Sequence, residues 1–273
     1  MSAPGAVATP EEERRLAEKR RSHDLPFDLM PLPSASLEDL DLTMFRETYI
    51  PASLAPDVIA QNQRSIDHQL LGARLVTPDN VPTVSGVLAI GRDSTQQVPG
   101  AYVQFLRIDG TQLVDQIVDQ KVLSGPLAQL LRLVEELLEL GVTAETDVTS
   151  SAMEQRTPDY PIVALQQLVR NAVLHRTYEG TNSPLRITWF ADRVEIQNPG
   201  GPFGQVSVDN FGQPGITDYR NPTLAAVMRT LGYVQRFGIG IELARNALAD
   251  NGNPQLEFDV DPHHVAVVIR RRQ

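Results

Sequence analysis

Three polar side chains spaced four residues apart interrupt an apolar stretch at residues 164–176. Gln167, Asn171 and His175 would lie along one stripe of a helix there, because residues four apart share a helix face. An amide oxygen is a hard ligand, so Asn171 could hold a divalent metal that bridges phosphate groups. The alternative is an asparagine that pairs with backbone inside a core, and this residue taken alone favours that alternative.

Two glycine-containing motifs downstream shift the balance towards a ligand site. Asn198, Gly200 and Gly201 follow a predicted strand, and glycine lets the backbone come close to a ligand. Gly238 and Gly240 stand directly before a predicted helix, where exposed amides and the helix dipole favour phosphate. Either motif by itself is typical of an ordinary turn or helix start. Their order behind the polar stripe is what makes them informative.

The elements that would position these residues follow from hydrophobic periodicity and turn signals. Helices are expected at residues 11–22, 36–50, 55–71, 126–140, 161–176, 222–231 and 241–250, and strands at 84–90, 101–108, 116–123, 185–190, 193–197, 256–260 and 265–270. Residues 142–160 are polar and indicate a linker or domain boundary, and residues 202–219 an irregular passage.

Together the motifs resemble the Bergerat-type ATP-binding fold of the GHKL superfamily, which gyrase, heat-shock chaperones, histidine kinases and MutL share. More narrowly, residues 160–271 resemble the ATPase-like, "RecG-like" domain of prokaryotic transcriptional regulators. The residues that carry the resemblance are Tyr160-Pro161, Asn171-Ala172, His175-Arg176, Asp192 to Ile196, Asn198 to Gly201, Arg220 to Pro222, Leu231 to Tyr233 and Gly238 to Ile241. It continues more loosely upstream, through Leu25 to Asp28, Leu37 to Asp41, Ser85 to Leu88 and Gly125 to Leu127.

The resemblance implies an α/β (α+β) fold in which helices cover a mixed, mainly antiparallel sheet, preceded by a smaller α/β domain. It implies ATP and Mg²⁺ as cofactors. Asn171 would hold the magnesium ion and Asn198 the adenine. The backbone around Gly238 and Gly240 would bind the phosphates, and Gly200 and Gly201 would also line the nucleotide site. Nucleotide would act by ordering residues 202–219.

Two departures from the family pattern bear on catalysis. Gln167 occupies the catalytic position at which the superfamily commonly has a glutamate that activates water. An amide cannot accept a proton at neutral pH, so it is no general base. Asn198 stands where an acidic residue usually contacts the adenine amino group; it keeps an acceptor oxygen but carries no charge. The expected function is an ATP-binding regulatory module that binds weakly or does not hydrolyse.

Two other functions remain open. An active ATPase would need another carboxylate, for which Glu195 and Asp192 are candidates if the fold turns them inward. A scaffold that only dimerises would have lost the ligand. Phosphotransfer is not expected from His23, whose surroundings resemble a kinase phospho-acceptor box, because prolines follow where a dimerising helix should continue.

The expected domain organisation has three parts. Residues 1–35 would be a charged helix and proline-rich linker, the remnant of an AlbA-type module of the Schlafen kind; residues 36–145 would form the small α/β domain and residues 146–273 the ATP-binding domain. The family contacts DNA through the AlbA-type module, so DNA binding is expected only through a separate module. Nucleotide is the expected partner, with a homodimer as a further expectation.

Composition limits the protein class, the partners and the location that can be expected. The 273 residues are 41% hydrophobic and 21% charged, as in a globular protein with a sizeable core. The formal net charge of −10 argues against nucleic acid or an anionic membrane as a partner of the whole chain. The chain has no cysteine, which excludes disulfides and thiol nucleophiles. It shows no bilayer-spanning run and no signal-peptide core, so a cytoplasmic location without membrane contact is expected.

Overall fold

The computed structural model describes residues 12, 13, 15, 16, 25–147, 155–234 and 238–272. The helices are α2 (Leu42–Met44), α3 (Ile50–Ser53), α4 (Pro56–Gln61), α5 (Ile66–Gly72), α6 (Val84–Ile90), α7 (Leu127–Gly141), α8 (Ile162–His175), α9 (Pro222–Thr230) and α10 (Gly240–Asn251), with a π-helical turn η3 (Phe45–Tyr49) and the 3-10 turns η1 (Phe27–Leu29), η2 (Leu37–Asp39) and η4 (Ser94–Gln96). The strands are β1 (Val103–Asp109), β2 (Gln116–Leu123), β3 (Ala144–Asp147), β4 (Gln155–Pro158), β5 (Leu185–Trp189), β6 (Arg193–Pro199), β7 (Glu257–Val260) and β8 (His264–Arg270).

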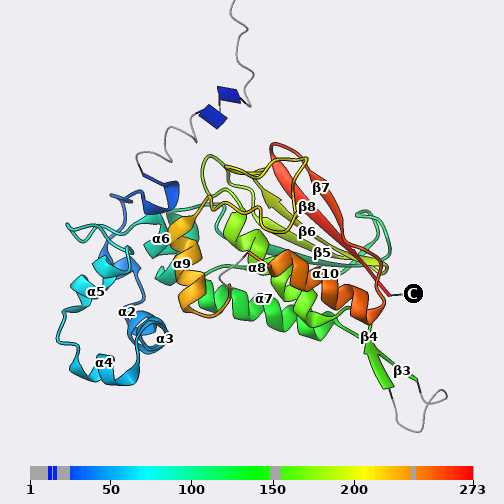
Figure 1. The fold of residues 1–273 in the computed structure, drawn as a ribbon, viewed down its shortest axis with the longest axis horizontal. Helices are drawn as coiled ribbons and strands as arrows, with labels where there is room; N and C mark the ends of the chain where they lie inside the picture. Colours follow the sequence, from blue (N-terminus) through cyan, green and yellow to red (C-terminus); the bar gives the residue numbers. More distant parts are fainter. Residues whose placement is uncertain (1–11, 14, 17–24, 148–154, 235–237, 273) are drawn as a thin grey trace, which may run out of the picture.

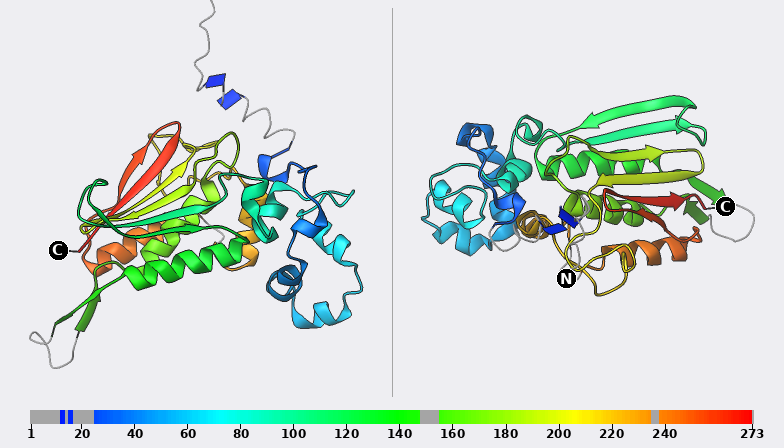
Figure 2. Two further views of the ribbon diagram at one scale, coloured as in Figure 1. Left: turned by 180° about the vertical axis from the view of Figure 1, so that it is seen from behind. Right: turned by 90° about the horizontal axis from the view of Figure 1, so that it is seen from above.

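Six of the strands form one sheet in the order β2-β1-β5-β6-β8-β7. Only the β1–β5 pair is parallel, and every other neighbouring pair is antiparallel. Helices α7, α8 and α10 cover one face of this sheet (Figures 1 and 2). The prediction of a mixed, mainly antiparallel sheet covered by helices is confirmed.

The core lies between the sheet and helices α7 and α8, and it follows from two periodicities. In β6 every second residue is buried, which turns Val194 and Ile196 towards the helices. In α7 the apolar residues recur three and four positions apart, which gives the helix one buried face. The core side chains include Leu131, Val134, Leu138, Leu165, Leu168, Val169, Leu185 and Ile187. A bidentate ion pair from Arg170 to Glu135, at 2.8 and 3.0 Å, fastens α8 to α7.

The sheet crosses the boundary that the sequence predicts at residue 145. Strands β1 and β2 come from the expected small domain, but β1 pairs with β5 along the register from Val103–Leu185 to Arg107–Trp189. In the described part of residues 25–100 the chain forms helices and turns with only isolated bridges, among them Leu40–Gly91. The described residues before 145 therefore form no separate sheet, because their β1–β2 hairpin is part of the larger one.

Residues 84–90 form helix α6, so the prediction of a strand there is wrong. The run is apolar except for Ser85 and all seven residues are buried, so it shows no periodicity that separates a helix from a strand. A helix cap and a close tertiary contact account for the helical state of this run. The Thr83 side chain accepts a hydrogen bond from the Gly86 amide and caps the helix. A side chain at Gly86 would overlap the Leu75 carbonyl, which shows how closely this helix packs.

Other predicted boundaries also change. Residues 142–160 contain the antiparallel hairpin of β3 and β4 instead of a linker. The predicted helix at 36–50 divides at Leu40, where Ser36 and Asp39 form a capping box for one turn and Asp41 caps the next helix. The helix at 55–71 divides into α4 and α5. Most of the predicted helix at 11–22 lies outside the described residues, and His23 lies wholly outside them.

A buried carboxylate joins the N-terminal segment to α9. Asp28 is 0% exposed, and its Oδ2 accepts hydrogen bonds from the amides of Thr223 and Leu224 at 2.7 and 2.9 Å. The hydroxyl of Ser85 donates a third bond at 3.2 Å. A carboxylate at this position complements the partial positive charge of the helix N-terminus. Asn221 makes the adjoining link, because its Nδ2 donates to the carbonyls of Leu174 and Arg176 at the end of α8.

Among the described residues, no helix has the length and apolar character that crossing a membrane requires.

Candidate functional site

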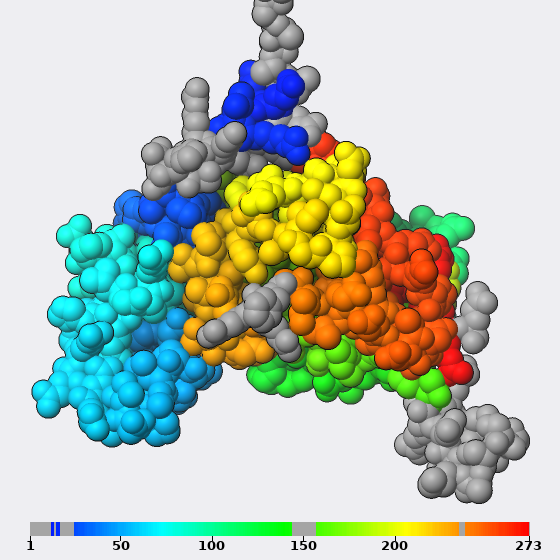
Figure 3. Space-filling model, viewed as in Figure 1, coloured from blue at the N-terminus to red at the C-terminus, as the bar shows by residue number. Residues whose placement is uncertain are grey.

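One pocket gathers all seven residues that the sequence predicts for a site. Its wall includes Gln167, Asn171, Asn198, Gly200, Gly201, Gly238 and Gly240, which come from α8, the end of β6 and the start of α10. The irregular segment 202–219, which we call the lid, closes the pocket from outside. In the space-filling view the lid lies in yellow above α10 (Figure 3). The cavity is partly open to solvent and measures about 170 Å³.

The polar stripe of α8, made of Gln167, Asn171 and His175, lines this cavity. Leu165, Leu168 and Ala172 are buried on the core side of the helix, whereas Gln167 and Asn171 reach the pocket wall. Within the described part of the chain, neither amide has a side-chain hydrogen-bond partner. The backbone-paired alternative for Asn171 therefore does not account for its position. An amide held against a cavity without a partner is available to a ligand.

Asn198 continues the inward face of β6. It follows Val194 and Ile196 in the alternation and is only 5% exposed, so a polar amide stands where the strand pattern would place an apolar side chain. No described side chain or backbone group bonds to this amide. Its amide atoms are not among the buried polar atoms that lack a partner, so they reach the cavity, where a bound group can form hydrogen bonds with them.

Gly200 and Gly201 shape the pocket wall by packing against the β7–β8 turn. Gly200 has φ of +91°, and its amide donates to the His263 carbonyl at 2.6 Å. The amide of Gly201 donates to the Pro262 carbonyl at 3.3 Å. Both N–H groups are therefore committed to protein acceptors. The structure explains the two glycines by close backbone contact, and their contact with a nucleotide stays a prediction.

The start of α10 offers uncommitted amides instead. No side chain among the described residues caps this helix, so the first-turn amides from Gly240 onward have no described side-chain acceptor. Gly238 has φ of +62°, and a Cβ there would lie 3.2 Å from the Cβ of Thr217 in the lid. A Cβ at Gly240 would lie 3.2 Å from the Oε1 of Gln167. Glycine at both positions lets the helix start close to α8 and to the lid.

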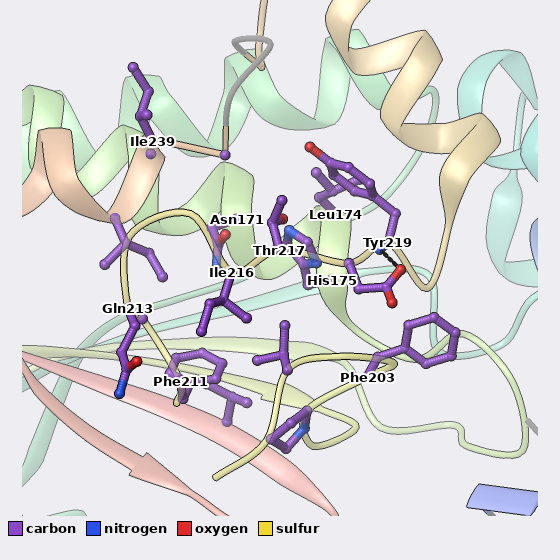
Figure 4. A pocket seen from close by; sticks show the side chains of 18 of the residues that line it. Asn171, Leu174, His175, Phe203, Phe211, Gln213, Ile216, Thr217, Tyr219 and Ile239 are labelled. Carbon is purple, nitrogen blue, oxygen red and sulfur yellow. Dashed lines mark hydrogen bonds between the residues drawn. The ribbon is translucent and has the colours of Figure 1, made fainter. Parts of the chain in front are cut away.

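The lid is held by several contacts and projects side chains into the cavity. Figure 4 shows it passing in front of α8, with Ile216 and Thr217 pointing into the space that Asn171 also faces. Arg245 of α10 donates to the Gly212 carbonyl at 2.7 Å. Phe211 packs edge-on against Phe258 of β7, with ring centroids 5.3 Å apart.

His175 ends the polar stripe as a neutral side chain. Its ring stacks on Tyr219 of the lid, with centroids 5.5 Å apart (Figure 4). Burial, together with the nearby Arg220 guanidinium, lowers the pKa of His175 to about 4, whereas Asp218 opposes the shift. The imidazole therefore acts at neutral pH as an uncharged surface for the lid.

This lowered pKa predicts how stability depends on pH. Because the folded-state pKa lies below the ordinary value of 6.5, the contribution of His175 is complete above 6.5 and is lost as the pH falls towards 4. We expect the wild type to lose stability over this window relative to His175→Gln, which carries no titrating group. Urea unfolding of both proteins at several pH values measures the difference. Parallel pH profiles for the two proteins would contradict the assignment.

The carboxylates that line the pocket are not the ones that the sequence analysis named. Glu195 and Asp192 lie away from the pocket and pair with Arg193 at 2.6 and 2.9 Å. The carboxylates that line the pocket are instead Asp218 of the lid and Glu242 in the first turn of α10. Asp218 already accepts hydrogen bonds from the amides of Gln205 and Tyr219. No periodic pattern marks the irregular lid, so sequence alone offered no signal for Asp218.

Comparisons with known proteins bear on the domain type and on the fold. A family model described as "Putative ATP-dependent DNA helicase recG C-terminal" matches residues 182–269. This match indicates an ATPase-like domain over β5 to β8, and it includes Asn198 and the glycines but not α8. A search of curated proteins finds no match.

Among solved structures, the chain is similar to one described as "Crystal Structure of the DIP2311 protein from Corynebacterium diphtheriae", with a TM-score of 0.68 and 18% sequence identity. The similarity covers 95% of this chain and 51% of that one, so the chain spans about half the length of that protein. At this identity the likeness shows a shared fold.

Proposed function

We propose that the pocket binds ATP together with Mg²⁺ and that the chain is a regulatory module which does not hydrolyse the nucleotide at an ordinary rate. One observation carries the proposal: two partnerless amides, Asn171 and Asn198, and the uncapped start of α10 face a single cavity. Three polar groups of these kinds match the metal, the base and the phosphates of one ligand. The family match to an ATPase-like domain supports the same ligand.

Each group has a role that its chemistry permits. The Asn171 oxygen would hold the magnesium ion, which would neutralise phosphate charge when bound. The Asn198 amide would bond to the adenine edge, and the first-turn amides of α10 would bind the phosphates. Gln167 lies beside the start of α10, where it can donate a hydrogen bond or orient water. Gln167 cannot take a proton from water, so the position at which the superfamily commonly has a glutamate provides no general base here.

The lid must move for a nucleotide to enter. Small-molecule sites usually measure about 300–1,000 Å³, whereas this cavity measures about 170 Å³ because lid side chains occupy part of it. Nucleotide binding would therefore break the lid contacts to Arg245 and Phe258. The shape of the protein surface at the lid would then depend on whether the pocket holds nucleotide. This coupling is the basis of the regulatory role. DNA contact is assigned to a separate AlbA-type module, consistent with the formal net charge of −10.

Isothermal titration calorimetry with ATP and Mg²⁺ tests the proposal. We expect a heat of binding for the wild type and its loss in Asn171→Ala, because the variant has no oxygen to hold the metal. Gln166→Ala is the matched control: it removes an amide from the same helix, but Gln166 lies outside the pocket wall and bonds to Glu139. The control should bind as the wild type does.

A phosphate-release assay on the same proteins separates the rival functions. Binding without release supports the proposed module. Release at an ordinary rate would favour an active ATPase that uses Asp218 or Glu242, the carboxylates of the pocket wall. Absence of any binding heat in the wild type would leave the ligand-free scaffold as the better description.

A further inference from the structure

Strand β2 forms an open edge of the main sheet. It pairs with β1 on one side, and no strand of the described chain pairs with its other side. It is the outermost strand when the molecule is seen from above (Figure 2). A free edge of this kind presents backbone N–H and C=O groups that another strand can pair with.

This edge is unusually apolar for an exposed one. Ile117, Val118 and Val122 are 52%, 59% and 62% exposed, and Leu113 and Val114 in the preceding turn are 67% and 87% exposed. Sheet edges are normally protected by proline, by charge or by a very short strand. Strand β2 has eight residues, contains no proline and carries a single lysine.

The sequence of β2 is complementary to itself in the antiparallel sense. About a two-fold axis at Gln120, Asp119 stands opposite Lys121 of a second copy, and Lys121 opposite its Asp119. In the same register Val118 opposes Val122, and Gln120 opposes Gln120. Opposite charges and β-branched pairs directly across an antiparallel ladder are stabilising. Each side of such an interface is the same surface, as two-fold symmetry requires.

The side chains that this register pairs lie on the same face of the sheet. Lys121 stands opposite the buried Phe105 in the β1–β2 ladder, so Lys121 and Asp119 share the helix-covered side. Their ammonium and carboxylate groups are already 3.0 Å apart within one copy. Val122 and Gln120 stand opposite Gln104 and Leu106 on the other side. The two-fold pairing therefore places charge against charge on the helix-covered face and glutamine against glutamine on the other face.

A bulge limits the regular part of the edge. The β1–β2 register shifts between Arg107 and Ile108, which leaves Val118 as the extra residue in β2. From Asp119 to Leu123 the ladder is regular. The proposed axis at Gln120 lies within this regular part.

We propose that β2 is a docking surface for a second copy of this chain, and that two copies join edge to edge at β2 into one continuous sheet with a two-fold axis at Gln120. The proposal does not depend on nucleotide binding. In this proposal the exposed valines and the Asp119–Lys121 pair both contact the second copy.

Site-directed cross-linking tests the register directly. The natural chain has no cysteine, so a single introduced thiol can react only with its twin. Directly opposite residues of an antiparallel pair lie about 4.5–5.5 Å apart at Cα, which suits a disulfide. We expect Gln120→Cys to form a covalent dimer under mild oxidation. Gln116→Cys is the matched control on the same strand, because its twin would lie roughly 26 Å away, and it should stay uncross-linked.

A charge-swap cycle tests the complementarity. We expect twice the monomer mass by light scattering for the wild type, and the monomer mass for Asp119→Lys, which places lysine opposite lysine. The double variant Asp119→Lys with Lys121→Asp restores opposite pairs and should restore the dimer. Val58→Lys, at an exposed valine of α4, should remain dimeric, and circular dichroism would confirm that each variant is folded.

The proposal is overturned by a wild type that stays monomeric across the accessible concentration range. It is also overturned by a dimer that the single charge reversal leaves intact, since that dimer would use another surface. Equal cross-linking of the Gln120 and Gln116 cysteine variants would contradict the register.

Discussion

Replacing Asp28 by alanine is expected to lower the free energy of unfolding by about 3 kcal/mol or more. The substitution leaves the amides of Thr223 and Leu224 and the hydroxyl of Ser85 without their acceptor in a fully buried position. Each buried donor that loses its partner costs about 1–3 kcal/mol. In a protein of this size the loss corresponds to a melting temperature lower by roughly 10 °C. Thermal and urea unfolding measure it.

Asp28→Asn separates the loss of an acceptor from the loss of charge. Asparagine keeps an oxygen that can accept from the two α9 amides, so it should cost clearly less than alanine. Burial raises the pKa of Asp28 above its ordinary 3.8, and this effect outweighs the hydrogen bonds that lower it. A raised folded-state pKa means that the contribution is complete below 3.8 and is lost as the pH rises through the folded value. The wild type should therefore lose stability relative to Asp28→Asn over that rise.

The Asp28 prediction concerns the joint between the N-terminal segment and the helix that follows the lid. Equal stability of wild type and Asp28→Ala would show that this joint contributes nothing to folding. A pH profile for the wild type that parallels the one for Asp28→Asn would show that Asp28 does not titrate as its burial implies.

Gly201→Ala is expected to destabilise the protein by about 2–3 kcal/mol and to weaken ligand binding at the same time. The added methyl group would overlap the Asp261 carbonyl and lie 2.7 Å from the carbonyl carbon of Pro262. Both neighbours are backbone, so the end of β6 or the β7–β8 turn must move. Because Asn198 lies three residues earlier on β6, this movement would also shift the amide that faces the cavity.

Gly72→Ala is the matched control for this prediction. Gly72 is the last residue of α5, and no atom beyond its chain neighbours and the backbone of its own helix lies within 4 Å of the position that its Cβ would take. Alanine is the better helix former, so this variant should be neutral or more stable by up to about 1 kcal/mol. Urea unfolding of both variants gives the comparison, and similar stability for the two would show that the β7–β8 turn yields without cost.

Much of the candidate site could be predicted because its signals are local. The four-residue spacing of Gln167 and Asn171 specifies a helix face whatever surrounds it. The alternation of β6 turns Asn198 to the same side as Val194 and Ile196. Glycine before α10 marks a backbone that must come close to other groups. These patterns placed the residues on the correct elements, and all of them line one pocket.

Helix α6 shows where local patterns stop being informative. A fully buried apolar run looks the same as a strand or as a helix, and its state depends on the cap at Thr83 and on contact with Leu75. The pairing of β1 with β5 likewise depends on residues 82 positions apart, so no window of sequence reveals that the hairpin completes the larger sheet.

The sequence by itself determined the helical stripe, because periodicity acts within a few residues, and the fold class followed from the family that its motifs resemble. Only the tertiary structure decided that Glu195 and Asp192 face away, that Asp218 and Glu242 replace them, and that the lid occupies part of the cavity. It also decided that strand β2, with its exposed valines, forms an open edge of the sheet. These outcomes depend on which distant segments pack together, and packing is a property of the whole chain.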